Sequence, residues 1–391
     1  MLIWCLSTVG LMYMASHTNI HTGLQSSLII TYASLKALLS RWNAHGQITS
    51  KTSTVIMFKT KVTNDIEFAY HDSGPPPDKS VYDTIILIHG HTYHSGTFKA
   101  MLDKAHAAGF RVILPNRRLY PGSTPYTKAE LDALQADPSG DDVTKAFQKQ
   151  GEYLLLFVNN MIVEHNLQSV LLAGWSLGTA FLAATIASIK TVSEDVQSNL
   201  RKAVKSIVLW DPPSQSHGVP DPPTGGWIPL YDESIPPEAR GQMFGQWLSQ
   251  YFPHKDLDKK DCKNLIYKID PPVKTPTFTG MSFEELLTKI DLTAGGNGDT
   301  FVADPPFRPI LNTVTKDALF DGTVRSAWGN IPFAIVYGEE GPYCVPWAVW
   351  KFEEQAEKAG LPLKTVSIPG GNHFAMHDLT ESSFEALRKC L

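Results

Sequence analysis

Short apolar runs alternate with amphipathic stretches along most of the chain. The runs are rich in aliphatic and β-branched residues, which is typical of strands buried on both faces. They include TIILIHG (84–90), RVILPN (111–116), SVLLAGWS (169–176) and VKSIVLWD (204–211). The stretches between them carry apolar residues at helical spacing, as in TFKAMLDKAHAAG (97–109), YLLLFVNNMIVEHN (153–166) and LGTAFLAATIASIK (177–190). This alternation predicts an α/β fold, with a mostly parallel central sheet and helices on both of its faces.

The alternation stops after Asp211. Residues 212–329 contain 15 of the 27 prolines, and prolines at this density interrupt long strands and helices. The pattern then resumes with PFAIVYG (332–338) and runs to the last helical stretch, ESSFEALRKC (381–390). We therefore expect one sheet domain, formed by residues 56–211 and 330–391, with an inserted cap over residues 212–329.

Residues 1–55 precede the first stretch with a core-like pattern and form a predicted N-terminal extension, with helical spacing over residues 24–39. The apolar start MLIWCLSTVGLMYMAS resembles the middle of a secretory signal, but no positive residue precedes it and it is too short to span a bilayer. We expect no stable membrane span and a cytoplasmic location.

Charge and cysteine content exclude several classes of partner. The chain has 34 basic and 39 acidic side chains, a net charge of −5, and no basic block, so nothing favours a nucleic acid or an anionic membrane. The four cysteines, Cys5, Cys262, Cys344 and Cys390, are scattered without metal-ligand spacing or a disulfide framework. Nothing in the sequence specifies an oligomeric state.

Gly-Trp-Ser-Leu-Gly at 174–178 fits the G-x-S-x-G nucleophile elbow, because a predicted strand precedes it and a predicted helix follows. The glycines let strand and helix pack closely around a strained turn. The hydroxyl of Ser176 is then held above the carboxyl ends of the strands. This motif makes Ser176 the candidate nucleophile.

A serine nucleophile needs a base and donors for the developing oxyanion. His373, in IPGGNHFAMHD, follows the last predicted strand and so lies at the same edge of the sheet; His377 falls later, where a helix is expected. The backbone N–H of His91, just after Gly90, and that of Leu177 are the predicted oxyanion donors.

The sequence leaves the third member of the triad open. The expected aspartate after the penultimate strand is missing, because Gly341 stands three residues past Gly338. Glu340 is close by and longer, and Asp211 ends the strand before the cap. Either carboxylate, or neither, is compatible with the chain order.

The chain resembles α/β-hydrolases of the fold-1 type over roughly residues 57–391, apart from the cap. The similarity lies in HG (89–90), NRRLYPGSTPY (116–126), GWSLG (174–178) and GGNHF (370–374). RRLYPGSTPY and WDPP (210–213) more narrowly resemble hydrolase-like proteins from fungal toxin and secondary-metabolite gene clusters. The resemblance implies hydrolysis of an ester, thioester or amide without a cofactor.

The predicted cap is rich in aromatic residues: Trp227, Tyr231, Phe244, Trp247, Tyr251 and Phe252. Ligand pockets are mostly apolar, so we expect a small-molecule substrate with a bulky hydrophobic acyl group. The leading hypothesis is a serine hydrolase acting on an ester or thioester. A lyase or cyclase with His373 as base, or a ligand-binding protein without turnover, are the alternatives.

Overall fold

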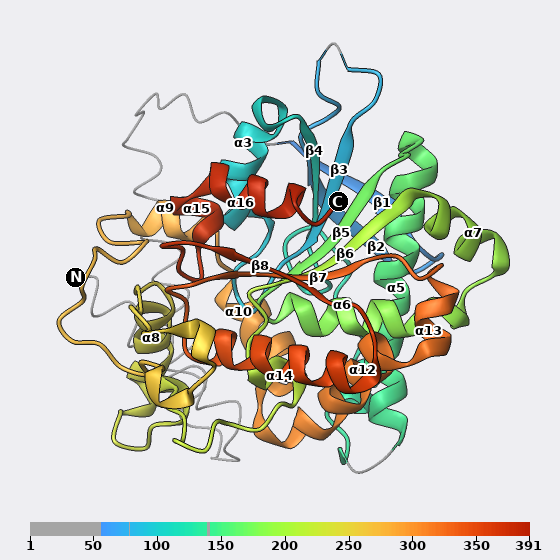
Figure 1. Ribbon diagram of the computed structural model, residues 1–391. Coiled ribbons are helices and arrows are strands. Elements are labelled where there is room, and N and C mark those ends of the chain that lie inside the picture. The colour runs from blue at the N-terminus through green and yellow to red at the C-terminus, as the bar shows by residue number, and fades with distance from the viewer. Residues whose placement is uncertain (1–55, 78, 139–140) are drawn as a thin grey trace, which may run out of the picture. The chain divides into compact units, whose positions relative to one another are not determined.

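The computed structural model describes residues 56–77, 79–138 and 141–391, and its central feature is an eight-stranded sheet (Figure 1). The strands are β1 (Met57–Lys61), β2 (Glu67–Asp72), β3 (Asp83–Ile88), β4 (Phe110–Pro115), β5 (Val170–Trp175), β6 (Val204–Trp210), β7 (Phe333–Gly338) and β8 (Lys364–Ile368). Their order across the sheet is β1-β2-β4-β3-β5-β6-β7-β8. β2 pairs antiparallel with β1 and β4, and all other neighbours are parallel. The predicted α/β class with a mostly parallel sheet is confirmed.

Helices cover both faces of this sheet (Figure 1). α3 (Lys99–Ala108) and α16 (Thr380–Arg388) lie on one face. The other face carries α5 (Asp141–His165), α6 (Gly178–Ala187), α12 (Arg308–Phe320) and α14 (Cys344–Ala359). The remaining helices are α4 (Lys128–Leu134), α7 (Glu194–Ala203), α8 (Pro237–Leu248), α9 (Phe283–Leu287), α10 (Leu292–Ala294), α11 (Thr300–Ala303), α13 (Gly322–Ala327) and α15 (Ala375–Asp378).

The core lies in the middle of the sheet and under α6. Every residue of β4 and of β5 is buried, as expected for strands covered on both faces. α6 follows β5 directly and is apolar all round, which suits its place between the sheet, α5 and α12. The serine of the elbow therefore sits at the junction of two deeply buried elements, β5 and α6.

Helices also occur where the sequence pattern predicted interruption. α12 and α13 lie within residues 212–329, and α12 packs against α6. α5 begins at Asp141, earlier than the predicted helix at 153–166. Residues 227–246 are assigned to a different compact unit from residues 56–226 and 247–391. The cap boundaries at 211 and 330 remain a prediction, and the predicted extension over residues 1–55 lies outside the described residues.

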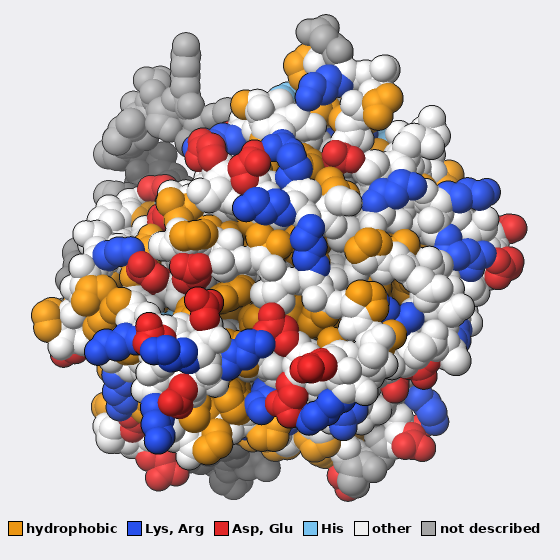
Figure 2. Space-filling view, in the orientation of Figure 1, with side chains coloured by type: hydrophobic (Ala, Val, Ile, Leu, Met, Phe, Trp, Pro, Cys, Tyr) orange, Lys and Arg blue, Asp and Glu red, His pale blue; other side chains and the backbone are white. Residues whose placement is uncertain are grey.

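The surface carries both signs of charge. On the face seen in Figure 2, acidic and basic side chains are interspersed. Within the residues that the structure describes, no helix is long and apolar enough to cross a membrane.

Candidate active site

Ser176 occupies the sharp turn between β5 and α6. Its φ is +55°, a left-handed conformation that non-glycine residues rarely adopt. A Cβ added to Gly174 would lie 2.5 Å from the carbonyl oxygen of Gly178, so a larger residue there would force strand and helix apart. The Ser176 N–H donates to the carbonyl of Trp210 on the neighbouring strand at 3.0 Å. The turn is thus fixed by close packing and by a backbone hydrogen bond.

His373 lies in the loop between β8 and α15, with its ring beside this serine. Its Nε2 is 2.9 Å from Ser176 Oγ. The indole N–H of Trp175 donates to the backbone carbonyl of His373 at 3.0 Å, and the two rings lie 4.9 Å apart. Trp175, the residue before the serine, therefore holds the histidine loop in place. The imidazole is 1% exposed, so water has little access to it.

Asp211 stands at the end of β6 and completes a chain of hydrogen bonds. Its Oδ2 is 2.7 Å from His373 Nδ1, and its Oδ1 accepts from the Gly338 N–H at 2.8 Å. The residue has a φ of +51° and is 1% exposed. A carboxylate can only accept, so Nδ1 carries the proton and Nε2 is free to accept from the serine hydroxyl. This is the arrangement of a serine, a base and an orienting acid.

Glu340, the other candidate acid, is held elsewhere by an ion pair. Its two carboxylate oxygens accept from Lys274 Nζ at 2.7 and 2.6 Å. Of the two carboxylates that the sequence left open, the structure brings Asp211 to His373 and directs Glu340 to Lys274. His377, the weaker candidate base, contacts Asp378.

Of the two predicted oxyanion donors, Leu177 follows Ser176 along the chain, and His91 lies in a loop that packs against the same serine. A Cβ on Gly90 would lie 2.9 Å from Ser176 Cβ, so the loop after β3 passes directly against the elbow. A Cβ on Gly178 would lie 2.4 Å from the carbonyl oxygen of Ile88, the last residue of β3. In the part of the chain that the structure describes, the amides of His91 and Leu177 donate to no other group. Both are therefore available to a ligand oxygen.

The side chain of His91 lies in a polar network. Its Nδ1 is 2.7 Å from Thr92 Oγ1, and Nε2 is 3.4 Å from Thr300 Oγ1. Burial lowers the pKa of His91, which favours the neutral ring at neutral pH. The candidate oxyanion donor is therefore the backbone N–H of His91 and not its ring.

The described residues contain no group of three or more His, Cys, Asp and Glu side chains that could hold a metal ion. Cys262, Cys344 and Cys390 are free thiols.

The model of the alpha/beta hydrolase family matches residues 85–386, which is most of the chain. The chain belongs to the alpha/beta hydrolase family. No curated protein matches it.

Several solved structures are similar to this chain. A laboratory-evolved variant of potato epoxide hydrolase is 16% identical, with a TM-score of 0.50, over 85% of this chain and 98% of that one. A mutant of the epoxide hydrolase from Solanum tuberosum is 14% identical, with the same coverage and TM-score. The thioesterase domain from the curacin biosynthetic pathway is 15% identical, with a TM-score of 0.43, over 85% of this chain and 99% of that domain. At these identities the similarity concerns the fold alone.

Sequence reasoning missed a buried chain of polar groups beneath the elbow. Thr179 Oγ1 donates to the carbonyl of Ser176 at 2.5 Å and accepts from His217 Nε2 at 2.8 Å. His217 Nδ1 in turn accepts from Thr315 Oγ1 of α12 at 2.8 Å. Burial lowers the pKa of His217 to about 3, so the ring stays neutral. Thr179, His217 and Thr315 are far apart in sequence, so no local pattern indicates these contacts.

Proposed function

We propose that this protein is a serine hydrolase that cleaves a carboxylic ester or thioester with a bulky hydrophobic acyl group. The continuous hydrogen-bond chain from Asp211 through His373 to Ser176 carries the proposal. A serine hydroxyl is a weak nucleophile until a positioned base removes its proton. The base lies within hydrogen-bond reach of both the serine and the acid.

In the proposed reaction Ser176 Oγ attacks the carbonyl carbon while its proton passes to His373 Nε2. The carbonyl electron pair moves to oxygen, where the amides of His91 and Leu177 stabilise the negative charge. The tetrahedral species collapses, the bond to the leaving oxygen or sulfur breaks, and the proton on Nε2 passes to that group. A water molecule then repeats the sequence, releasing the acid and restoring Ser176. Asp211 holds the tautomer throughout and stabilises the charged imidazole.

An aromatic cluster beside these loops supports a hydrophobic acyl group. Tyr93, in the loop after β3, stacks on Phe278 with ring centroids 5.7 Å apart, and Phe278 lies 4.6 Å from Phe374, the neighbour of His373. Phe278 is only half-buried, so part of its ring is open to an apolar ligand. The resemblance of RRLYPGSTPY and WDPP to proteins of fungal toxin and secondary-metabolite clusters supports a role in that metabolism.

A fluorophosphonate probe with mass-spectrometric site mapping tests the nucleophile. We expect covalent labelling at Ser176, abolished in Ser176→Ala and retained in Ser193→Ala, which alters an exposed helix cap. Hydrolysis of p-nitrophenyl esters should show a higher kcat/KM for octanoate than for acetate. A folded protein that stays unlabelled, and that hydrolyses no ester or thioester of the series, would contradict the proposal.

A further inference from the structure

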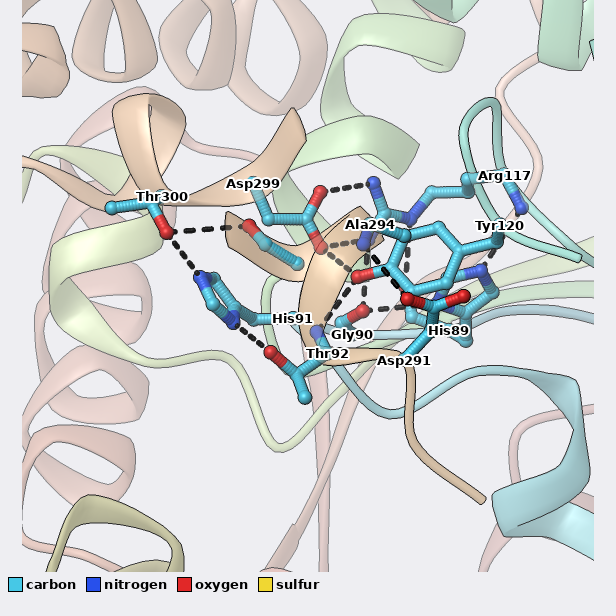
Figure 3. Close-up of polar contacts among 11 residues, drawn as sticks. His89, Gly90, His91, Thr92, Arg117, Tyr120, Asp291, Ala294, Asp299 and Thr300 are labelled. Carbon is cyan, nitrogen blue, oxygen red and sulfur yellow. Dashed lines mark hydrogen bonds and ion pairs between the residues drawn. The ribbon is translucent and has the colours of Figure 1, made fainter. Parts of the chain in front are cut away.

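A buried polar cluster surrounds the loop that carries the His91 amide (Figure 3). At its centre Arg117 forms a two-pronged ion pair with Asp299, with Nη1–Oδ1 at 2.8 Å and Nη2–Oδ2 at 2.7 Å. Their side chains are 2% and 1% exposed. Arg117 follows β4, whereas Asp299 lies in the Pro-rich stretch between β6 and β7. An ion pair so deeply buried is costly to form, so a purely stabilising role does not explain it well.

The cluster holds one particular carbonyl, that of Gly90. Arg117 Nη2 donates to the Gly90 oxygen at 2.8 Å, and His89 Nδ1 lies 2.9 Å from the same oxygen. His89 Nε2 accepts from the Arg117 backbone N–H at 2.9 Å, which assigns the proton of the neutral ring to Nδ1. Burial, together with the charge of Arg117, lowers the pKa of His89 and keeps it neutral. Two donors therefore converge on the Gly90 oxygen.

That oxygen belongs to the same peptide plane as the His91 N–H. In a trans peptide C=O and N–H point in opposite directions and cannot rotate independently. Fixing the Gly90 oxygen therefore fixes the direction of the His91 N–H. A cation on the oxygen also polarises the peptide and strengthens the N–H as a donor.

The backbone of Thr92, the residue after His91, also depends on contacts with this cluster. Thr92 has a φ of +64°, which is disfavoured for a β-branched residue. Its N–H donates to Tyr120 Oη at 2.7 Å, and its carbonyl accepts from the Asp291 N–H at 2.8 Å. The Tyr120 hydroxyl donates to Asp299 Oδ2. Backbone held in such a conformation relaxes when its partners are removed.

We propose that Asp299 is a positioning residue for the oxyanion site: through Arg117 and Tyr120 it orients the Gly90–His91 peptide so that the His91 N–H faces the reacting carbonyl oxygen. The inference rests on the proposed serine hydrolase function. It assigns to the stretch between β6 and β7 a part in the chemistry in addition to any contact with substrate.

Asp299→Asn tests this with the smallest change in shape. The amide NH2 replaces an oxygen that accepts from Arg117 or Tyr120, so the ion pair loses its fit. Loss of an oxyanion donor lowers kcat by about 10²–10³-fold, and a displaced donor loses part of that. We expect kcat to fall about 10–100-fold with KM changed less than about threefold. The Ki of a trifluoromethyl ketone, whose serine adduct carries the oxyanion, should rise by a similar factor.

Asp72→Asn is the matched control. Asp72 forms a buried ion pair with Arg111 between β2 and β4, and its carboxylate accepts hydrogen bonds from Gly74 and Arg111, outside the cluster. Asp72→Asn should lower the melting temperature about as much as Asp299→Asn does, while leaving kcat and the inhibitor Ki unchanged. Tyr120→Phe, which removes only a hydroxyl, tests the same peptide if Asp299→Asn does not fold. We expect about a tenfold lower kcat for that variant.

The outcomes separate the two proposals. A wild-type protein with no ester or thioester turnover would overturn the proposed function and this inference with it. An active wild-type protein whose folded Asp299→Asn and Tyr120→Phe variants keep kcat and inhibitor Ki would overturn the inference alone. A rise in KM at constant kcat would also overturn it, because that pattern belongs to substrate binding.

Discussion

Replacing Asp211 by Asn tests the orienting acid with little change in shape, and the structure predicts which way the new amide will face. An Asn side chain offers one acceptor oxygen and one NH2 group. The Gly338 N–H, 2.8 Å from Oδ1, can only donate, so the amide oxygen must take that position. The NH2 group then replaces Oδ2, 2.7 Å from His373 Nδ1.

The consequence for His373 is the wrong tautomer. An NH2 group donates to Nδ1, so the ring proton moves to Nε2, and Nε2 can no longer accept from Ser176. A substitution of this type lowers kcat about 10⁴-fold in a serine protease. That factor corresponds to about 5.4 kcal/mol, at about 1.36 kcal/mol for each tenfold change in rate. We expect a loss of this size for Asp211→Asn.

The assay is steady-state hydrolysis of a p-nitrophenyl ester, with thermal melting to verify the fold. Glu340→Gln is the matched control: it removes a carboxylate whose partner, Lys274, is 47% exposed at its side chain. Such surface pairs contribute about 0–1 kcal/mol, so kcat should not change. Retention of more than about a tenth of the activity by Asp211→Asn would refute the tautomer argument. Loss of activity in Glu340→Gln alone would identify Glu340 as the acid.

Two further substitutions test the packing and the buried histidine. Gly90→Ala would place a Cβ 2.9 Å from Ser176 Cβ and 3.0 Å from two ring carbons of Trp175. We expect a kcat at least about tenfold lower, measured on the same ester, because even small displacements of reacting groups slow catalysis; wild-type turnover would show that the loop can move aside. His217 has a pKa lowered to about 3 by burial, whereas an unfolded histidine titrates near about 6.5. Its contribution to stability is therefore complete above about pH 6.5 and is lost as the pH falls towards 3. In His217→Gln the free energy of unfolding, measured by urea titration, should depend less steeply on pH between about 6.5 and 4, by about one proton. An unchanged slope would indicate that His217 does not titrate differently in the folded and unfolded states.

The fold was predictable where short-range pattern carries the information. β3 and β5 are continuous apolar runs, and the structure has them within a residue or two of the predicted bounds. The first half of α5 was missed because DDVTKAFQKQGE offers few apolar residues at helical spacing. α12 was missed for a different reason. Pro309 stands in its first turn, where proline starts a helix and does not break it, and the apolar spacing that follows was readable.

In the candidate site, too, local motifs could be predicted from the sequence, whereas contacts between distant residues could not. Ser176 and His373, whose side chains lie 2.9 Å apart, could be proposed as candidates because the elbow is a local motif and chain order supplies the base. The acid was left open because chain position does not tell where a side chain points, and only a contact with Lys274 directs Glu340 away. The pair of Arg117 and Asp299 joins positions 182 residues apart. No pattern in the sequence near Arg117 or near Asp299 indicates this contact.

The left-handed backbone conformation of Ser176 lowers the stability of the folded protein, while the proposed activity requires a serine at this position. Such a conformation costs a non-glycine residue about 1–3 kcal/mol, and glycine adopts it freely. Ser176→Gly should therefore be inert yet melt at a higher temperature than the natural protein. A variant of this kind could retain an uncleaved substrate in a crystal or on an affinity column, so that the same strained backbone that places the hydroxyl beside His373 provides a route to the natural ligand.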